Sequence, residues 1–316
     1  MHSYVYKTKK DRENDLNLNK FYINGNFVQG SIKMNHKDGK LANKIIQLQN
    51  DDGTWGLAFH SLSQPYKRYP LTTEQALRRL KVLGFTVNDT PIRKAVDCMI
   101  LCLHGERKID TYWEKTHNWE LFTQLMLSTW VRLFEPDNEI ALKFSKRWSN
   151  IIEKAFESGT YNHDAYLDAY LSEFSLKPKG IRELDFSDFY HIHLLQGVLS
   201  EKTENLLLDY IISKQSGIYY IYSKPLDKLP NYFASKEVSW YLSAIEILSG
   251  YKLAKEKLSF VIDWLENNKD ENGQWDLGAK ANDNVYFPLS DSWKKADYRK
   301  ADCTERIVNV LQKLNS

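Results

Sequence analysis

The stretch QNDDGTWG (residues 49–56) closes a segment rich in Ile and Leu with acidic residues, a Gly and a Trp. A close copy, DENGQWD (270–276), follows about 220 residues later. Gly53 and Gly273 give the backbone the freedom to leave a helix, but a turn by itself does not require a Trp two residues after the Gly. We therefore predict that Trp55 and Trp275 fold back as buried wedges between helices, each with its indole N–H in a hydrogen bond.

The sequences around the two turns match as well. NKIIQLQNDDGTW (43–55) leads through a loop to LTTEQALRRLKVLG (71–84), and FVIDWLENNKDENGQW (260–275) leads through a loop to DCTERIVNVLQKL (302–314). A weaker third copy pairs LDYIISKQSGIYY (208–220) with SKEVSWYLSAIEIL (235–248), with Tyr219 at the Trp position. Two-helix units stack because neither helix buries its apolar face alone. Similar first and last units favour closure of the stack into a ring.

These turns resemble the QW motif, Q-x-x-x-G-x-W, of the terpenoid cyclases and protein prenyltransferases. Gln49 to Trp55 matches the motif fully, whereas Asn268 or Lys269 replaces its Gln in the last copy. The resemblance covers the first quarter and the last third of the chain. It implies an all-α fold, an α/α toroid with inner and outer helix rings around a central, often aromatic-lined cavity. Helices that follow a QW-type turn would be inner helices whose first residues face the cavity mouth.

Helical patterns run along most of the chain and predict roughly eleven helices in one domain, 36–316, after an N-terminal lead-in, 1–35. The predicted segments are 40–50, 72–85, 91–105, 118–134, 136–159, 163–175, 185–200, 202–214, 235–250, 252–268 and 302–314. One of the helices between 136 and 200 is expected to stand outside the alternation of the two rings. No convincing strand pair is predicted, and IYYIYS (218–223) is the best strand candidate.

Composition narrows the class of protein. Hydrophobic residues make up 42% of the 316 residues and aromatic residues 13%, so a sizeable core is expected. The 43 basic and 41 acidic residues nearly balance, which gives no indication of a nucleic-acid partner. Apolar runs such as CMILCL (98–103) are too short to span a bilayer, and no signal peptide is visible. With three cysteines and no CxxC motif, we expect a soluble, cytoplasmic protein without an integral membrane segment.

The first candidate for chemistry is DFSDFYHIH (185–193). Asp188 and His191 are three residues apart and share a helix face, which suits a proton-transfer pair. The string DFYH also resembles the protein prenyltransferase segment whose His binds catalytic zinc, so the resemblance implies His191 as a ligand. The Asp-x-Cys motif that supplies the other zinc ligands in that family is missing from this sequence. Zinc needs three protein ligands plus an open position. The alternative is that Asp188 caps the helix while Tyr190 and His193 form a wall.

The second candidate is YNHDAYLDAY (161–170), in which Asp164 and Asp168 are four residues apart. Such a pair can act as acid and base or hold a divalent ion such as Mg²⁺. The alternative is a core stripe of Tyr and Leu with Asp near the helix N-terminus. Neither the DDxxD nor the DxDD motif of terpenoid enzymes occurs in the chain, which argues against ordinary protonation-driven cyclisation.

The third candidate is YFPLSDSWKKADYRKADCTERI (286–307), interpreted as a long ordered loop. Cys303, placed at the start of a helix, is expected to have a lowered pKa and is a second weak metal candidate. The alternative role for this loop is to close the ring against 40–50. The predicted substrate-binding residues are Tyr190, His193, Trp240, Trp293, Arg299, Asp302 and Arg306.

Other polar residues receive a structural interpretation. His60, His104 and His117 are scattered and are interpreted as loop or capping histidines. The basic turn SLKPKGIRELD (175–185) carries Lys177, Lys179 and Arg182, which could bind a diphosphate, although a plain exposed loop is the simpler interpretation.

Two classes of enzyme and one non-catalytic class follow from these patterns. The resemblance favours an enzyme that acts on an isoprenoid or another hydrophobic substrate, because aromatic faces stabilise developing cations. A carbohydrate-active toroid, either a lyase or a glycosidase, needs two carboxylates and stacking aromatics. A scaffold whose cavity binds a ligand remains open, because the standard motifs are missing. Zinc or magnesium is a possible cofactor. An apolar aromatic cavity would favour the first class, and an open groove with two carboxylates the second.

Overall fold

The computed structural model describes residues 21–23, 26–28, 36–60, 70–109, 116–283 and 285–315. This described part of the chain is all-helical apart from one short hairpin. Its α-helices are α2 (Lys40–Ile46), α3 (Thr73–Val82), α4 (Thr90–Leu103), α5 (Trp119–Phe134), α6 (Glu139–Ala155), α7 (His163–Phe174), α8 (Ile181–Leu184), α9 (Phe189–Leu194), α10 (Glu201–Ser213), α11 (Lys236–Leu248), α12 (Ala254–Lys257), α13 (Ser259–Asn267) and α14 (Ala296–Asn315). Two 3-10 turns, η1 (His36–Asp38) and η2 (Ala279–Ala281), complete the helical elements of the described residues.

Each of the eleven predicted segments contains a helix, and the described residues hold two more than predicted. One is α8, a single turn, and the other arises because the segment 252–268 is divided into α12 and α13. The largest difference in bounds concerns α14, which begins at Ala296 rather than at 302. The first part of the predicted long loop is therefore helical.

The expectation that the chain holds no strand pair is wrong. β1 (Phe21–Ile23) and β2 (Asn26–Val28) pair in antiparallel fashion within the predicted lead-in. Asn24-Gly25 lies between them in sequence, and this dipeptide is a strong hairpin signal. The strand candidate 218–223 forms a tight turn instead, in which the Ile218 N–H donates to the Tyr222 carbonyl at 2.9 Å.

The two Gly-x-Trp turns are built in the same way. Trp55 donates its backbone N–H to the Thr73 hydroxyl at 2.9 Å and its indole N–H to the Ile45 carbonyl at 2.8 Å. Trp275 makes the equivalent bonds, to Thr304 at 3.1 Å and to Leu265 at 2.7 Å. The two side chains are 0% and 1% exposed, which confirms that both are buried wedges. Each Trp thereby joins the helix before its turn to the helix that follows the loop.

The first and last repeats lie in contact, as the matching turns predict. His36 Nε2 is 2.9 Å from Glu305 Oε2 of α14. The backbone N–H of Lys40, the first residue of α2, donates to the Asp291 carboxylate at 3.3 Å. Arg79 of α3 donates to the Val285 carbonyl at 2.8 Å, although the two residues are 206 positions apart. Segments from the two ends of the chain are thus held together by polar contacts.

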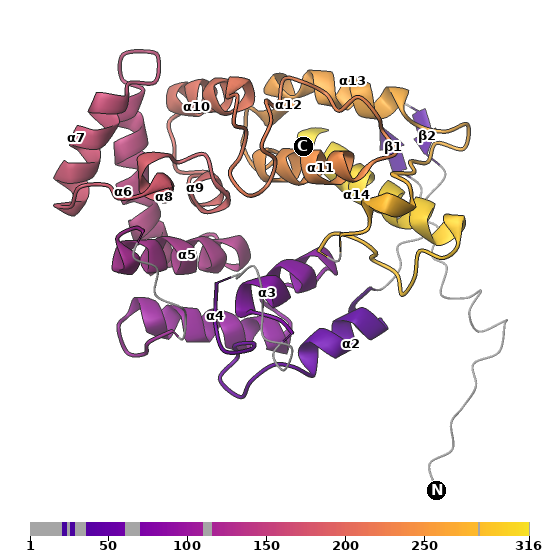
Figure 1. The fold of residues 1–316 in the computed structure, drawn as a ribbon, viewed down its shortest axis with the longest axis horizontal. Helices are drawn as coiled ribbons and strands as arrows, with labels where there is room; N and C mark the ends of the chain where they lie inside the picture. The colour runs from indigo at the N-terminus through magenta and orange to yellow at the C-terminus, as the bar shows by residue number, and fades with distance from the viewer. Residues whose placement is uncertain are drawn as a thin grey trace, which may run out of the picture.

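The helices fall into a central group and a surrounding group (Figure 1). α3, α5, α9, α11 and α14 lie nearest the centre of the molecule, while α2, α4, α6, α10, α12 and α13 lie outside them. α7 packs against α6 at the far edge of this arrangement. Polar residues on the helices of the central group take part in the site described below. No helix in the described ranges is long and apolar enough to cross a membrane.

Candidate functional site

A cavity of about 1030 Å³, here called the first cavity, opens between the central helices. It is lined by the first turns of α3 and α11, by α9, and by loops before and after them. Its aromatic and charged lining residues are His60, Glu74, Arg78, His117, Arg182, Asp188, Phe189, Tyr190, Tyr219, Tyr220, Lys236, Trp240, Asp283 and Tyr286. The cavity therefore combines aromatic faces with three cations and three carboxylates.

Glu74 of α3 is the hub of this lining and is 1% exposed. Its carboxylate accepts hydrogen bonds from Arg78 at 3.0 Å and from the Tyr190 hydroxyl at 2.8 Å. The Trp130 indole N–H lies 3.3 Å from the same oxygen. His60 Nδ1 is 3.1 Å from the second oxygen of Glu74. A buried carboxylate is tolerable only when it is paired and hydrogen-bonded in this way.

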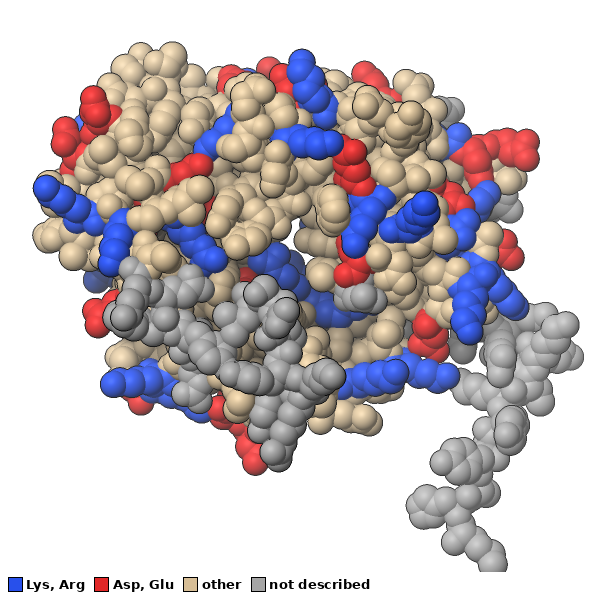
Figure 2. Space-filling view, in the orientation of Figure 1, with Lys and Arg blue, Asp and Glu red and all other residues tan. Residues whose placement is uncertain are grey.

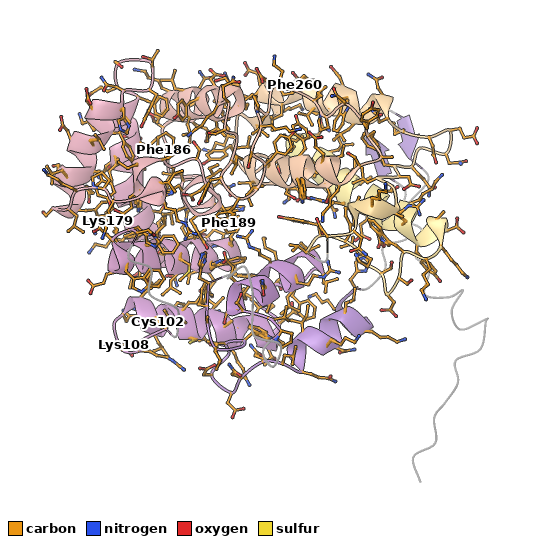
Figure 3. The ribbon with its side chains drawn as sticks, in the orientation of Figure 1. Cys102, Lys108, Lys179, Phe186, Phe189 and Phe260 are labelled. Atoms are coloured by element: carbon orange, nitrogen blue, oxygen red, sulfur yellow. The ribbon has the colours of Figure 1, made fainter. Side chains whose placement is uncertain are left out.

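The network sets the protonation of its neighbours. Burial lowers the pKa of Arg78, but the charges of Glu74, Tyr286 and Tyr190 and the hydrogen bond to Glu74 together outweigh this effect, and the net shift is upward. Burial and the Glu74 charge together raise the pKa of Tyr190 well above its ordinary value. Arg78 also lies 3.7 Å above the Phe189 ring, and Phe189 lies on the side of α9 nearest the centre of the molecule (Figure 3). Arg78 is therefore a fixed cation and Tyr190 a hydroxyl donor.

Arg182 stands next to this network and, among the described residues, has no carboxylate of its own. Its guanidinium is 3.2 Å from His60 Nε2. Because arginine can only donate, Nε2 accepts, and the ring proton of His60 lies on Nδ1, toward Glu74. The guanidinium also lies 4.7 Å from the centre of the Phe122 ring. Within the described residues no carboxylate lies within ion-pair distance of Arg182.

A second cavity, of about 510 Å³, is lined by the last turns of α3 and α11 and by α14. Arg78, Phe189, Ser243 and Tyr286 line both cavities, so these residues form the partition between them. The charged residues of the second cavity are Arg78, Lys81, Glu246, Arg306 and Lys313, and His193 joins them. Together the two cavities hollow the centre of the molecule, and Figure 2 shows basic side chains bordering a central opening.

His193 of α9 is held neutral within the second cavity. Burial lowers its pKa, and the charges of Lys81, Arg78 and Lys313 add to the effect, so that the pKa falls to about 3. The Nδ1 atom of His193 is buried without a hydrogen-bond partner among the described residues. Burial, reinforced by the neighbouring cations, thus opposes protonation of this ring.

The depressed pKa of His193 predicts a loss of stability in acid. Its folded value, about 3, lies below its ordinary value of 6.5, so the unfolded chain binds a proton that the folded chain rejects. The contribution is fully present above pH 6.5 and is lost as the pH falls toward 3, at up to about 1.4 kcal/mol per pH unit. Chemical denaturation between pH 7 and pH 4 should therefore give a shallower decline for His193→Gln than for the wild type.

The matched control is His104→Gln, because His104 is exposed at the end of α4. Its stability should follow the wild-type pH dependence. Equal slopes for the His193 variant and the wild type would contradict the assignment of a neutral, buried His193.

Arg306 lies on the wall of the second cavity and is held there by hydrogen bonds to the protein. Its Nε donates to Glu246 at 2.6 Å, and its remaining N–H groups donate to Ser239 and Ser243 at 2.9–3.0 Å. The guanidinium also lies 4.3 Å from the Tyr286 ring centre. All three nitrogens of its guanidinium donate to α11, so Arg306 ties α14 to α11.

Asp188 and His191 are close together, but only one of them reaches a cavity. Asp188 lines the first cavity and caps α9, since it accepts from the backbone N–H groups of Tyr190 and His191 at 2.8 and 3.0 Å. His191 Nδ1 lies 2.8 Å from the Asp188 carboxylate. The His191 side chain is 0% exposed and packs edge-on against Trp148, 4.3 Å between ring centres. Neither cavity is lined by His191.

The structure separates Asp164 and Asp168 from this region. Both are exposed on α7, which packs on α6 rather than beside the cavities. The buried face of α7 is formed by Tyr166 and Tyr170, whose hydroxyls donate to Glu183 at 2.6 and 2.7 Å. The two aspartates therefore lie on the solvent side of a helix whose aromatic stripe is core.

The segment 291–306 mainly makes contacts within itself and with neighbouring loops. Asp302 is buried and accepts from the Trp293 indole N–H at 2.6 Å and from the Leu289 N–H at 2.8 Å. Arg299 forms a two-pronged ion pair with Asp276, at 2.6 and 2.7 Å. Of the predicted substrate-binding residues, Tyr190 and Trp240 line the first cavity, and His193 and Arg306 line the second.

The expectation of a lowered pKa for Cys303 is wrong. Because α14 begins at Ala296, Cys303 lies inside the helix rather than at its start. It is completely buried, and burial raises the pKa of its thiol to about 12. No group of three or more His, Cys, Asp or Glu residues in the described ranges is placed to hold a metal ion.

His60, Glu74 and Arg78 were not predicted as site residues, and Arg182 was named only within a basic turn that could bind a diphosphate, with a plain exposed loop as the simpler interpretation. A usable signal existed for Glu74 and Arg78, because they stand in the first turns of the helix that follows the full QW-type turn. The contact between His60 and Arg182 carried no such signal, since the two residues meet only in space, 122 residues apart in sequence. A search of protein-family models, of curated proteins and of solved structures finds no match to the chain.

Proposed function

We propose that this chain is an α/α toroid of the QW-repeat type and an enzyme that acts on an isoprenoid diphosphate in its first cavity. Three features support the toroid: equivalent hydrogen bonds at the two Trp turns, contact between the first and last repeats, and a central group of helices that lines both cavities. The observation that carries the enzyme proposal is Arg182, a cation without a carboxylate partner in the described ranges, oriented by Glu74 through His60 in an aromatic cavity.

The diphosphate would bind near Arg182 and Lys236. Lys236 begins α11, lies 5.5 Å from the Trp240 ring centre, and has no carboxylate within ion-pair distance among the described residues. The first turns of α3 and α11 also line this cavity, and helix N-termini carry a partial positive charge that favours anions. Arginine is suited to such a head group because its planar fork donates two parallel hydrogen bonds to phosphate oxygens.

The isoprenoid chain would lie among Phe189, Tyr190, Tyr219, Trp240 and Tyr286. When the allylic C–O bond breaks, the diphosphate leaves with the bonding electrons, and the positive charge remains on the hydrocarbon. Aromatic faces stabilise such a cation. The cation then forms a bond to a nucleophile or loses a proton to give a neutral alkene. Departure of diphosphate does not require the acid of a DxDD motif, so the missing motif is compatible with this chemistry.

A carbohydrate-active function has less support. A glycosidase needs two carboxyl groups free to act as acid, base or nucleophile. Glu74 accepts from four side chains and Asp188 caps α9. Asp283 accepts from three consecutive backbone N–H groups, those of residues 285–287, at 2.9–3.2 Å. The three carboxylates of the first cavity are therefore committed to the protein's own donors. The open volume of about 1030 Å³ also argues against a scaffold filled by side chains.

Farnesyl diphosphate is a suitable probe of this proposal. We expect saturable binding by calorimetry, at least tenfold weaker in Arg182→Met, which corresponds to about 1.4 kcal/mol. The variant should melt like the wild type, because Arg182 has no ion pair to lose within the described residues. Farnesol, which lacks the diphosphate, should bind more weakly than farnesyl diphosphate to the wild type but equally to both proteins.

The matched control is Arg147→Met, because Arg147 lies on α6 in an ion pair with Glu173 at 2.7 Å, outside both cavities. Its affinity for farnesyl diphosphate should equal that of the wild type. Binding of oligosaccharides but not of the isoprenoid, or equal affinities of the Arg182 and Arg147 variants, would reject the proposed function.

A further inference from the structure

Lys81 lines the second cavity and takes no part in the network of the first. It lies in the last turn of α3, and its side chain is exposed although α3 belongs to the central group of helices. Its ammonium nitrogen is 5.8 Å from the centre of the Phe134 ring, and no carboxylate in the described ranges lies within ion-pair distance of it. The amine is therefore accessible to a molecule in the cavity and is not held by a counter-charge.

The charges around Lys81 disfavour its protonated form. The other titratable groups that line the cavity are Arg78 of α3, His193 of α9, Glu246 of α11, Tyr286, and Arg306 and Lys313 of α14. Burial lowers the pKa of Lys81, the charge of Lys313 lowers it further, and Glu246 only partly opposes them, so that the pKa falls to about 8. Glu246 is bound to Arg306 at 2.6 Å rather than to Lys81.

A lysine in this environment is a nucleophile near neutral pH. At pH 7 an amine with a pKa of about 8 is neutral in about one molecule in ten, against roughly one in three thousand at the ordinary value of 10.5. A less basic amine is also a weaker nucleophile, so only part of this ratio appears in a reaction rate. Desolvation and a neighbouring cation are two means by which proteins activate the lysines that form imines with carbonyl compounds.

The rest of the second cavity suits an apolar partner for this amine. Aromatic and aliphatic side chains form much of its wall, among them Val82, Trp130, Leu133, Ile247, Leu289 and Val310. The volume of about 510 Å³ lies within the range of sites that hold small organic molecules. An apolar compound that enters the cavity thus comes to lie beside an accessible amine.

We propose that Lys81 binds an apolar aldehyde covalently in the second cavity, as an imine. The neutral amine adds its lone pair to the carbonyl carbon, and a proton passes from the nitrogen to the former carbonyl oxygen. The hydroxyl group then leaves as water with the second proton of the nitrogen, and a C=N bond joins Lys81 to the ligand. The step needs no oxidant or reductant, and it does not depend on what the first cavity binds.

Reductive trapping with benzaldehyde and sodium cyanoborohydride, read by peptide mass spectrometry, tests this site at pH 7. Cyanoborohydride reduces the imine to a stable secondary amine, so each trapped lysine is measured separately. Trapping at Lys81 should be at least about tenfold faster than at Lys143, an exposed lysine of α6. Benzyl alcohol, which has the same ring but no carbonyl group, should slow trapping at Lys81 by occupying the cavity and should leave Lys143 unchanged.

Two variants, each first shown by melting to be folded, complete the test. Lys313→Met leaves Lys81 in place and removes a charge that lowers its pKa, so trapping at Lys81 should slow by about threefold or more. Arg182→Met alters the first cavity only and should be trapped like the wild type. The proposal is overturned if Lys81 is trapped no faster than Lys143, if Lys313→Met leaves the rate at Lys81 unchanged, or if benzyl alcohol slows both lysines alike.

Discussion

Replacing Trp55 with Ala is expected to lower the free energy of unfolding by about 3–5 kcal/mol, because a fully buried indole leaves a cavity that its surroundings fill only in part. The change also removes one of the donors to the Ile45 carbonyl, which keeps its backbone partner, the Leu48 N–H. Trp275→Ala should behave alike, since Trp275 makes the equivalent bond to Leu265. Urea denaturation followed by circular dichroism measures both variants against the wild type.

The control for this prediction is Trp240→Ala, because Trp240 is 46% exposed on the wall of the first cavity. Its cost should be well below that of either turn variant, and its effect should fall on ligand binding instead. A Trp55 variant that melts like the wild type but no longer binds ligand would show that the turn belongs to the site rather than to the framework.

Glu74→Gln should lower the free energy of unfolding by an amount similar to that of Trp55→Ala. The substitution leaves Arg78 as a buried cation without its carboxylate, and removal of one partner of a buried pair typically costs about 3–5 kcal/mol. The new amide N–H₂ would also face the donors of Arg78, Tyr190 and Trp130. Denaturation of the single variants and of the double variant Glu74→Gln with Arg78→Met should show that the two losses are far from additive.

Glu157→Gln provides the matched carboxylate control. Glu157 is largely exposed and pairs with Lys154, which is exposed as well, and such surface pairs contribute about 0–1 kcal/mol. Similar costs for the Glu74 and Glu157 variants, or simple additivity in the Glu74–Arg78 cycle, would contradict the description of Glu74 as the hub of a buried network.

The repeat could be predicted from sequence because its determinants are local. In each turn the Gly, the Trp and the helix that receives the indole bond lie within about a dozen residues, and the receiving Thr opens the next helix. Contact between the first and last repeats followed from their similarity. The bounds of α14 could not be predicted in the same way, because the residues from 296 to 301 carry few apolar side chains and give no clear period.

The site was harder to predict because its contacts are long-range. Glu74 and Tyr190 are 116 residues apart, and the hydrogen bond between them exists only once α3 and α9 are packed. Residue spacing on one helix gave a wrong prediction where two faces of the helix carried the same repeat. On α7 the pair Asp164 and Asp168 and the pair Tyr166 and Tyr170 both repeat every four residues, and burial of the tyrosines places the aspartates in solvent.

His191 illustrates the same limit. Its spacing from Asp188 correctly predicted their contact, at 2.8 Å, but spacing does not say which side of α9 faces a cavity. Tyr190, one position earlier, points toward Glu74 and the first cavity, while His191 packs into the core against Trp148. Adjacent residues on a helix differ by about 100° in direction, so one residue decides between lining and core.

The most direct test of the proposed isoprenoid site is a crystal structure with farnesyl thiodiphosphate, an analogue whose head group leaves slowly. The account predicts that the analogue occupies the first cavity, with its diphosphate at Arg182 and Lys236 and its hydrocarbon chain against Tyr190 and Trp240. An analogue bound outside that cavity, or one whose diphosphate lies away from Arg182, would contradict it.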